Sequence, residues 1–336
     1  MLNISEAVTE PYLNYHLFHE NLNTRVKVLT ASLNQVIELL MIPGNENKMS
    51  ELIKAADESW QYPPSFSLPE PKVTFKTSKR KMTQQEMDDT HEKLMRDKKR
   101  LSQEMLYCYV SELAIFGSFS ALDDCFVDIN ATIDSWDHFK QIHTSRVAFE
   151  HDDKLTKFYG SFGWDISGIA KYLPIFNYFR AIRNSVAHRN SKASPVLESI
   201  SRSAELKDSV AKMFSAGEPL PEFLHNETIY IRPKTTLLCS HIIREICKDM
   251  NKHLIGMLGA EGLIFMACNH AFNPAAYDEV DKTQLAKARL NDTLNNRYHI
   301  TLKGDDVAVK LAVSIGVWSD CSKLHSARMR VLNPKF

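Results

Sequence analysis

The longest helical pattern in the chain runs from Thr83 to about Ile133 and limits the possible folds more than any other feature. Thr83 begins "TQQE", a capping-box pattern that marks the start of a helix. The second half of the run has apolar residues at steps of three or four with one longer gap, which predicts a helix with one face against a core. These residues are Met105, Tyr109, Leu113, Phe116, Leu122, Phe126, Ile129 and Ile133. A mostly α chain is therefore expected.

Helices are also predicted on both sides of this run. Apolar periodicity and turn residues place them at 24–42, 49–60, 174–190, 195–214 and 234–258. Pro174 is suited to the first turn of its helix, and Ser194 is the candidate N-cap of the next. A loop with three glycines is expected between 134 and 173. The segment "ETIYIRP" predicts one short strand, and 297–318 is compatible with either a hairpin around Gly304 or a further helix.

These patterns divide the chain into four segments. An N-terminal helical region at 1–60 is followed by a Pro-rich, basic linker at 61–82, where four prolines fall within twenty residues. A helical domain is predicted at 83–258. The fold of 259–336 stays open as a small α or α+β appendage.

Composition excludes several classes of protein. Formal net charge is zero, so the overall field does not attract nucleic acid, and any contact with it requires a local basic patch. The six cysteines show no CxxC pair and no zinc-type spacing to a histidine. The N-terminus has no apolar signal region, and the most apolar stretch is shorter than a membrane span and contains Glu261. A cytoplasmic protein without a membrane partner is expected.

The segment "RNSVAHRN" at 183–190 is the strongest candidate for a functional site. Spacing alone is a poor signal, because composition makes one Arg-x4-His pair unsurprising and "RVAFEH" supplies a second at 146–151. With about 100° per residue, the apolar residues around Ile182 form one face, and Arg183, Asn184 and His188 fall on the opposite side. Asn184 and His188 are four residues apart and are expected to touch. Acidic neighbours weaken the second pair as a phosphate site, since they repel phosphate.

These residue types suit RNA cleavage without a metal. The 2′-OH of RNA can attack the adjacent phosphorus if a base accepts its proton, and a histidine can serve because its ordinary pKa of about 6.5 lies near neutral pH. A guanidinium can hold the phosphate and offset the developing charge. One histidine is poorly placed for both proton transfers, so a dimer that pairs two motifs makes mechanistic sense. The alternative is an ordinary amphipathic helix whose polar face meets water.

The segment "RNSVAH" resembles the R-x4–6-H signature of HEPN (higher eukaryotes and prokaryotes nucleotide-binding) domains. Asn184 directly after the arginine and the small Ala187 before the histidine fit that signature, and "FSALDDCFVDI" resembles an earlier helix that carries an acidic residue facing the motif. The resemblance covers about residues 101–258 and is specific at one hexapeptide. The first hundred residues and the last seventy-five have no counterpart in it.

The resemblance implies a HEPN-like helical bundle with an N-terminal helical extension, acting as a homodimeric, metal-independent endoribonuclease in toxin or antiviral-defence systems. Its products would be 2′,3′-cyclic phosphate and 5′-OH ends, with no cofactor and with RNA and an antitoxin or regulatory partner as ligands. It assigns catalysis to Arg183, His188 and Asn184, and a supporting role to Asp123 or Asp124. Contacts with RNA would come from Arg180 and Arg189. A non-catalytic HEPN-like module for dimerisation or for nucleotide or partner binding is the alternative.

Other candidate sites are weaker. His138 and His143, with His151 and its acidic neighbours, lack the spacing of a helical two-histidine metal site. The basic clusters "TSKRK" and "DKKR" have acids interleaved and few aromatics nearby, which favours a solvated surface. Phosphate-binding GxxxxGK[ST] and GxGxxG loops and the GxSxG nucleophile motif are missing from the sequence.

Overall fold

The computed structural model describes residues 2–40, 84–148, 153–213, 219–273, 285–304 and 306–332. Helices dominate these ranges, which confirms the expectation of a mostly α chain. The longer helices are α1 (Glu10–Leu40), α3 (Gln84–Lys140), α5 (Leu173–Arg189), α8 (Pro233–Ala271) and α11 (Trp318–Leu332). The shorter helical elements are α4 (Lys154–Ser161), η1 (Ile166–Tyr172), α6 (Pro195–Arg202), α7 (Ala204–Met213), α9 (Ala286–Asp292), η4 (Thr293–Arg297) and α10 (Val307–Ser314). The expected helix at 49–60, the linker at 61–82 and Thr83 lie outside the described residues.

The chain divides into two compact units, and neither is one continuous segment. The first comprises Met1–Asn23, Ala114–Ile229 and Leu237–Phe336, and the second comprises Thr24–Leu113 and Tyr230–Thr236. The C-terminal region from 259 onward therefore belongs to the same unit as the helices around the Arg-x4-His motif. The sequence-based boundaries treat these two regions as separate.

Helix α8 forms much of the core of the first unit. Ile242, Ile246, Met250 and Leu254 are fully buried at steps of four, as its apolar periodicity predicts. The helix kinks at Gly259, whose φ of 58° and ψ of −168° are not helical, which explains why the predicted helix ends at 258.

The N-terminal segment is anchored to α8 by a buried amide. The Oδ1 atom of Asn251 accepts hydrogen bonds from the backbone N–H of Thr9 at 2.8 Å and from its hydroxyl at 2.6 Å. The Nδ2 atom of the same amide donates to the carbonyl of Ala7 at 3.1 Å. Because the three bonds satisfy a buried polar group, they hold the start of the chain in the first unit.

The apolar stripe of α3 is buried only in its second half. Leu122, Ile129 and Ile133 are 1–2% exposed, whereas Leu113 is 70% exposed and Tyr109 44%. The prediction that the apolar stripe faces a core along its whole length, from Met105 to Ile133, is wrong. Nine residues separate Leu113 from Leu122, which is about 900° of rotation, or half a turn more than a whole number of turns. The longer gap in the pattern therefore places the two halves on opposite faces.

Two hydrogen bonds from α3 connect segments within the second unit. The Ser111 hydroxyl donates to the carbonyl of Ile231 at 2.7 Å, and the Tyr107 hydroxyl donates to Oδ1 of Asn34 on α1 at 2.5 Å. Residues 230–236, which precede and begin α8, thereby belong to this unit.

Two expected elements differ from the structure because of local capping. The segment 134–173 is not a simple loop, since Asp153 caps α4 and Asp165 caps η1 through side-chain bonds to backbone N–H groups. The helix expected at 195–214 is two helices that meet at Ser203. The Ser194 cap of α6 is confirmed, because its hydroxyl accepts from the N–H of Leu197 at 3.1 Å.

The two expected β segments also have different partners. The prediction of a strand over "ETIYIRP" is wrong, because within this segment only Thr228 forms a β-bridge, with Lys192. The alternate residues Ile229 and Ile231 are nevertheless buried. In 297–318 a further helix, α10, is present rather than a hairpin. The two-residue strand β2 (Thr301–Leu302) instead pairs antiparallel with β1 (Leu2–Asn3) at the other end of the chain.

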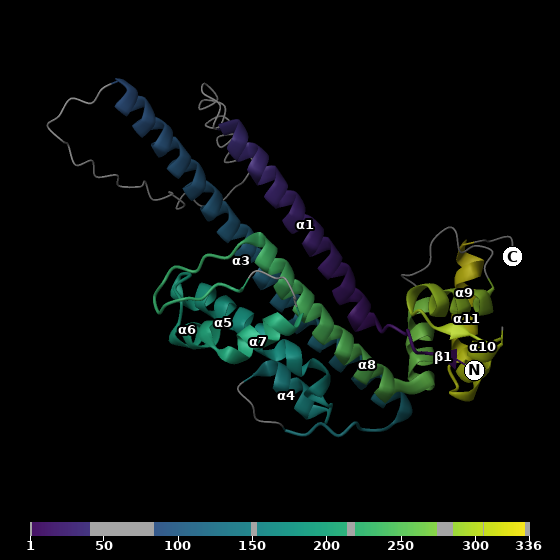
Figure 1. Cartoon of the computed structure of the whole chain (residues 1–336). Helices are drawn as coiled ribbons and strands as arrows, with labels where there is room; N and C mark the ends of the chain where they lie inside the picture. Colours follow the sequence, from purple (N-terminus) through teal and green to yellow (C-terminus); the bar gives the residue numbers. More distant parts are fainter. Residues whose placement is uncertain are drawn as a thin grey trace. The chain divides into compact units, whose positions relative to one another are not determined.

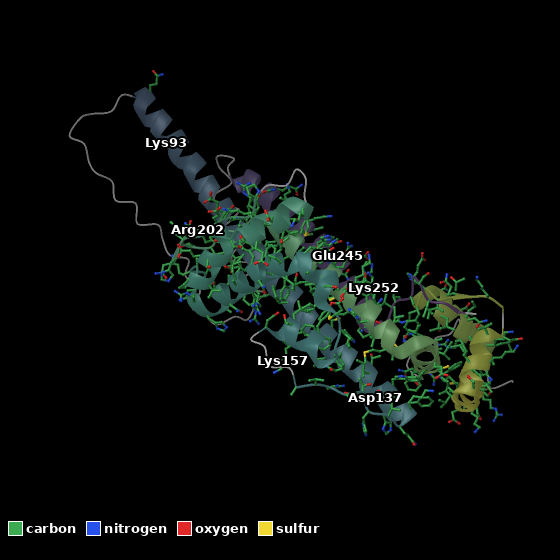
Figure 2. All side chains as sticks on the ribbon, turned by 60° about the horizontal axis from the view of Figure 1, so that its bottom comes forward. Lys93, Asp137, Lys157, Arg202, Glu245 and Lys252 are labelled. Atoms are coloured by element: carbon green, nitrogen blue, oxygen red, sulfur yellow. The ribbon has the colours of Figure 1, made fainter. Side chains whose placement is uncertain are left out.

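Two groups of helices lie within the first unit. Helices α5, α6 and α7 pack against one another, and α9, α10 and α11 form a second group beside β1 (Figure 1). Charged side chains such as Lys157 of α4 and Arg202 of α6 project outward from their helices (Figure 2). The first group carries the candidate site.

Candidate functional site

Helix α5 holds the Arg-x4-His motif on a rigid support. Ile175, Tyr178 and Ile182 are fully buried, as the helical periodicity predicts, and the buried face also includes Phe176, Ala181 and Ser185. The helix ends at Arg189 because Asn190 adopts a left-handed conformation with φ of 49°. The motif therefore occupies the last two turns of a helix fixed by its core face.

Arg183 and Asn184 contact each other at this end of α5. The Nη1 atom of Arg183 donates to Oδ1 of Asn184 at 3.2 Å, and the guanidinium lies 5.8 Å from the ring centre of Phe116. Arg183 is half-buried, whereas Asn184 and His188 are exposed. Within the described part of the chain, the His188 side chain forms no hydrogen bond, and the amide of Asn184 bonds to Arg183 instead of to His188 as expected. His188 is open to a ligand.

The two candidate acids of α3 have different surroundings. Asp123 lines the same cavity as Arg183, but its carboxylate pairs with Nζ of Lys154 at 2.6 Å. Asp124 is exposed and does not line that cavity. Of the two, Asp123 is therefore the one that lies near the motif, and its carboxylate forms an ion pair with Lys154 rather than with Arg183.

Arg180 is held by an acid that sequence reasoning did not select. Its Nη1 atom donates to Oδ1 of Asp153 at 2.5 Å, and the Asp153 side chain is 9% exposed. The same carboxylate caps α4 through the backbone N–H and the hydroxyl of Thr156, at 3.1 and 2.7 Å. The pattern Asp-x-x-Thr before a helix was the available signal. Arg180 is thus engaged in a structural contact.

Arg189 contacts the segment that precedes α8. Its Nη2 atom donates to Oδ1 of Asn226 at 3.1 Å and lies 3.4 Å from Nε2 of His225. Burial raises the pKa of Tyr178 on the same helix, and its hydroxyl donates to the carbonyl of Pro221 at 3.0 Å. Both ends of the segment 221–226 are therefore bound to α5.

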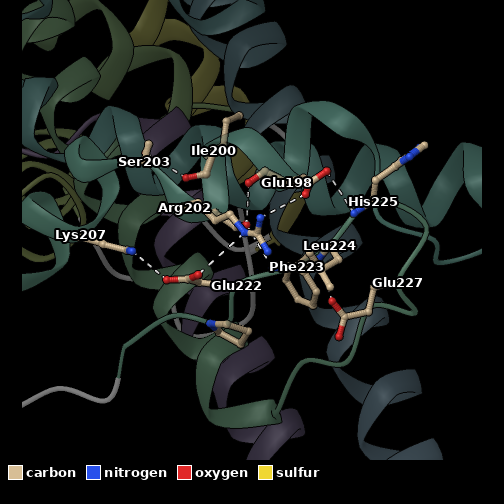
Figure 3. Close-up of polar contacts among 12 residues, drawn as sticks. Glu198, Ile200, Arg202, Ser203, Lys207, Glu222, Phe223, Leu224, His225 and Glu227 are labelled. Carbon is tan, nitrogen blue, oxygen red and sulfur yellow. Dashed lines mark hydrogen bonds and ion pairs between the residues drawn. The ribbon is translucent and has the colours of Figure 1, made fainter.

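A charged network fastens this segment to α6 and α7 as well (Figure 3). Arg202 pairs with Glu198 at 3.3 Å and with Glu222 at 3.9 Å, and Lys207 pairs with Glu222 at 2.8 Å. The second carboxylate oxygen of Glu198 accepts from the backbone N–H of His225 at 3.2 Å. These groups are partly exposed, so each pair contributes little, and their combined effect is to position the segment beside Arg189.

A cavity of about 370 Å³ lies beside the motif. Its walls come from α3, α4, α5 and α6, and Arg183 and Asn184 form part of them whereas His188 does not. Two polar atoms of these walls are buried without a hydrogen-bond partner, namely Oδ1 of Asn177 and Nε of Arg183. Asn177 was not among the residues that the sequence indicated.

Groups of three or more potential metal ligands are absent from the residues that the structure describes. His138 and His143 are exposed there, and His151 falls outside the described ranges. One described helix, α8, is long and apolar enough to cross a membrane, but 56% of its most apolar window is buried in the fold. Core helices of soluble proteins share that property.

Comparisons with models of protein families, with curated proteins and with solved structures found no match to this chain.

Proposed function

We propose that the protein is a HEPN-type endoribonuclease that cleaves RNA without a metal ion. The observation that carries the proposal is the last two turns of α5, where Arg183, Asn184 and His188 lie on the side away from a fully buried face. Arg183 is oriented by Asn184 and by the Phe116 ring, while His188 is exposed and unengaged among the described residues. A positioned cation and a free imidazole are the two groups that the reaction requires.

In the proposed reaction, the neutral imidazole of His188 accepts the proton of the 2′-OH as that oxygen attacks phosphorus. The bond to the 5′-oxygen breaks, the departing oxygen takes a proton, and the products carry 2′,3′-cyclic phosphate and 5′-OH ends. Arg183 offsets negative charge on the phosphate oxygens during attack, and Asn184 keeps its guanidinium in place. A second copy of the chain supplies a protonated His188 for the leaving group, so the active form is a homodimer.

The setting that goes with this activity is a cytoplasmic toxin or an antiviral-defence effector. Uncontrolled RNA cleavage harms the cell that makes the enzyme, so an antitoxin or a regulatory partner is part of the proposal. Arg189 is the better placed of the two expected RNA contacts, because it bonds to the neutral amide of Asn226 and not to a carboxylate. Arg180 is neutralised by Asp153 and contributes through the shape of the site.

The test is cleavage of a structured RNA in EDTA by the wild type and by His188→Ala, with the product ends identified. His143→Ala is the matched control, since His143 is also an exposed histidine but lies far from the motif in sequence. We expect the wild type and the control to yield cyclic phosphate ends and His188→Ala to lose at least a hundredfold in rate, as is typical when a general acid–base group is removed. Equal cleavage by His188→Ala would contradict the catalytic role, and loss of wild-type cleavage in EDTA would contradict the metal-free mechanism.

The second candidate is a non-catalytic helical module for dimerisation or ligand binding. It is favoured by one observation, that Arg180 and Arg189 are already engaged with groups of the same chain. Expression in cells separates the two functions. The nuclease predicts growth arrest that Arg183→Ala relieves, and the module predicts normal growth with either protein.

A further inference from the structure

The cavity beside the motif has the size and lining of a binding site for a small planar ligand. Its volume of about 370 Å³ is at the lower end of the range for small-molecule sites. The lining combines charged and amide side chains with apolar ones, and it includes three largely buried aromatic side chains, from Phe119 and Phe126 of α3 and from Phe176 of α5. Aromatic walls stack favourably on nucleobases, and they do so in many proteins that bind single-stranded RNA.

One amide oxygen in the wall lacks the hydrogen bond that its burial requires. Oδ1 of Asn177 is buried without a donor, and leaving such a group unpaired is unfavourable. The terminal torsion of an asparagine is broad, so a turn of the amide brings this oxygen toward the cavity that the residue lines. A ligand with a neighbouring donor and acceptor would satisfy both atoms of the amide. Adenine presents that pair at N6 and N7, and it is the base that asparagine reads in a bidentate manner.

The charges around the cavity favour an anion at its edge. Of the three basic side chains in the wall, Lys154 and Arg180 are paired with Asp123 and Asp153, while Arg183 bonds to the neutral Asn184. The two ion pairs are neutral overall, and the positive charge of Arg183 is left at the side where the motif begins. A nucleotide would therefore fit with its base among the aromatic rings and its phosphate at Arg183.

We propose that this cavity binds the adenine base of the nucleotide that flanks the cleaved phosphate, with Asn177 as the residue that reads the base. This assignment rests on the proposed ribonuclease function for its role, but the binding itself can be measured without any cleavage. The cavity thereby makes the site selective for adenine, while Arg183 holds the phosphate that His188 acts on.

The binding test uses isothermal titration of the purified full chain with 5′-AMP, GMP, CMP and UMP. AMP should bind at least tenfold more tightly than the other three, and Asn177→Leu should weaken AMP binding by about tenfold, the lower end of what a bidentate pair contributes to base discrimination. Because Asn177→Leu changes a half-buried residue, Val196→Trp provides a second variant. Val196 is 62% exposed and lines the cavity, so a larger side chain there obstructs the site without entering the core.

Val127→Trp is the matched control, since Val127 is 65% exposed on α3 and does not line the cavity. We expect Val196→Trp to abolish AMP binding and Val127→Trp to leave it unchanged. Four nucleotides that bind equally well, AMP binding unaffected by both cavity variants, or no binding of any nucleotide by the folded wild type would overturn the proposal.

Cleavage of short oligonucleotides then separates this proposal from the proposed function. If AMP binds selectively but no RNA is cleaved, the cavity stands and the ribonuclease does not. If RNA is cleaved with equal kcat/KM beside all four bases, and Asn177→Leu cleaves like the wild type, the ribonuclease stands and the adenine site does not. Both hold if cleavage beside adenine is favoured and Asn177→Leu removes that preference while cleavage beside the other bases continues.

Discussion

Of the polar contacts near the site, the ion pair between Asp153 and Arg180 should contribute most to the free energy of unfolding. Asp153 is nearly buried, with its side chain 9% exposed, and its carboxylate both accepts from Arg180 and caps α4. The change Asp153→Asn keeps an oxygen for the cap, because asparagine and aspartate are equally good N-caps. It removes the charge that pairs with Arg180. Asp153→Ala removes the cap as well.

The magnitude follows from the exposure of the two partners. Exposed ion pairs contribute up to about 1 kcal/mol, and breaking a fully buried pair costs about 3–5 kcal/mol. Arg180 is 34% exposed, so this pair falls between the two cases, and Asp153→Asn should lower the free energy of unfolding by about 2 kcal/mol. Loss of the cap adds about 1 kcal/mol, which makes Asp153→Ala about 3 kcal/mol less stable than the wild type.

Urea unfolding of the wild type, Asp153→Asn, Arg180→Met and the double variant tests this reasoning as a double-mutant cycle. The double variant should be less destabilised than the sum of the single variants by about 1 kcal/mol, because each single change leaves one charge without its partner. Additive effects, or an Asp153→Asn variant within about 0.5 kcal/mol of the wild type, would refute the assignment of a stabilising pair. A variant Asp153→Ala equal to Asp153→Asn would refute the cap.

Three further changes have defined outcomes. Burial raises the pKa of Glu10, but its hydrogen bonds and its attraction to Arg297 outweigh burial, so the net pKa is lowered. The stability that the ionised Glu10 adds is complete above its ordinary pKa and is lost as pH falls through the lower folded value. Glu10→Gln should therefore flatten the decline in the urea midpoint between pH 6 and about pH 3. Gly168→Ala places a Cβ 2.5 Å from Oδ1 of Asp249 and should cost about 1–3 kcal/mol in the same unfolding assay. Gly256→Ala, in the interior of α8 with open space around it, should instead stabilise by up to about 1 kcal/mol, and destabilisation there would show that the position is more crowded than its surroundings indicate.

Local patterns in the sequence predicted the local elements. The apolar periodicity of α5 correctly identified Ile175, Tyr178 and Ile182 as its core face, and Ser194 was correctly chosen as the cap of α6. Both predictions depend on residues within a few positions of one another, where helical geometry alone determines what shares a face. The same reasoning failed for Leu113, because one longer gap in the stripe rotates it to the opposite side of α3 from Leu122.

Contacts between distant segments were beyond the reach of these patterns. Leu2 pairs with Leu302 across nearly the whole chain, and a two-residue strand has too few residues to show an alternating pattern. The cavity is built from four helices whose mutual packing no periodicity specifies, which is why Asn177 received no role from the sequence. The partners of Arg180 and Asp123 came from the N-cap and the first residue of α4, a helix that lies where a loop with three glycines was expected.

By itself, the sequence determined that the chain is helical and that Arg183, Asn184 and His188 share the polar side of one helix. Those properties follow from the fixed rotation per residue of an α-helix, which links spacing to direction without reference to the rest of the chain. Only the tertiary structure decided which charges are neutralised and which remain open. Arg180 is paired because Asp153, the N-cap of α4, lies beside α5, and Arg189 is bonded because the segment 221–226 lies there too. The His188 side chain is exposed. Such proximity arises from packing between segments rather than from spacing along one of them.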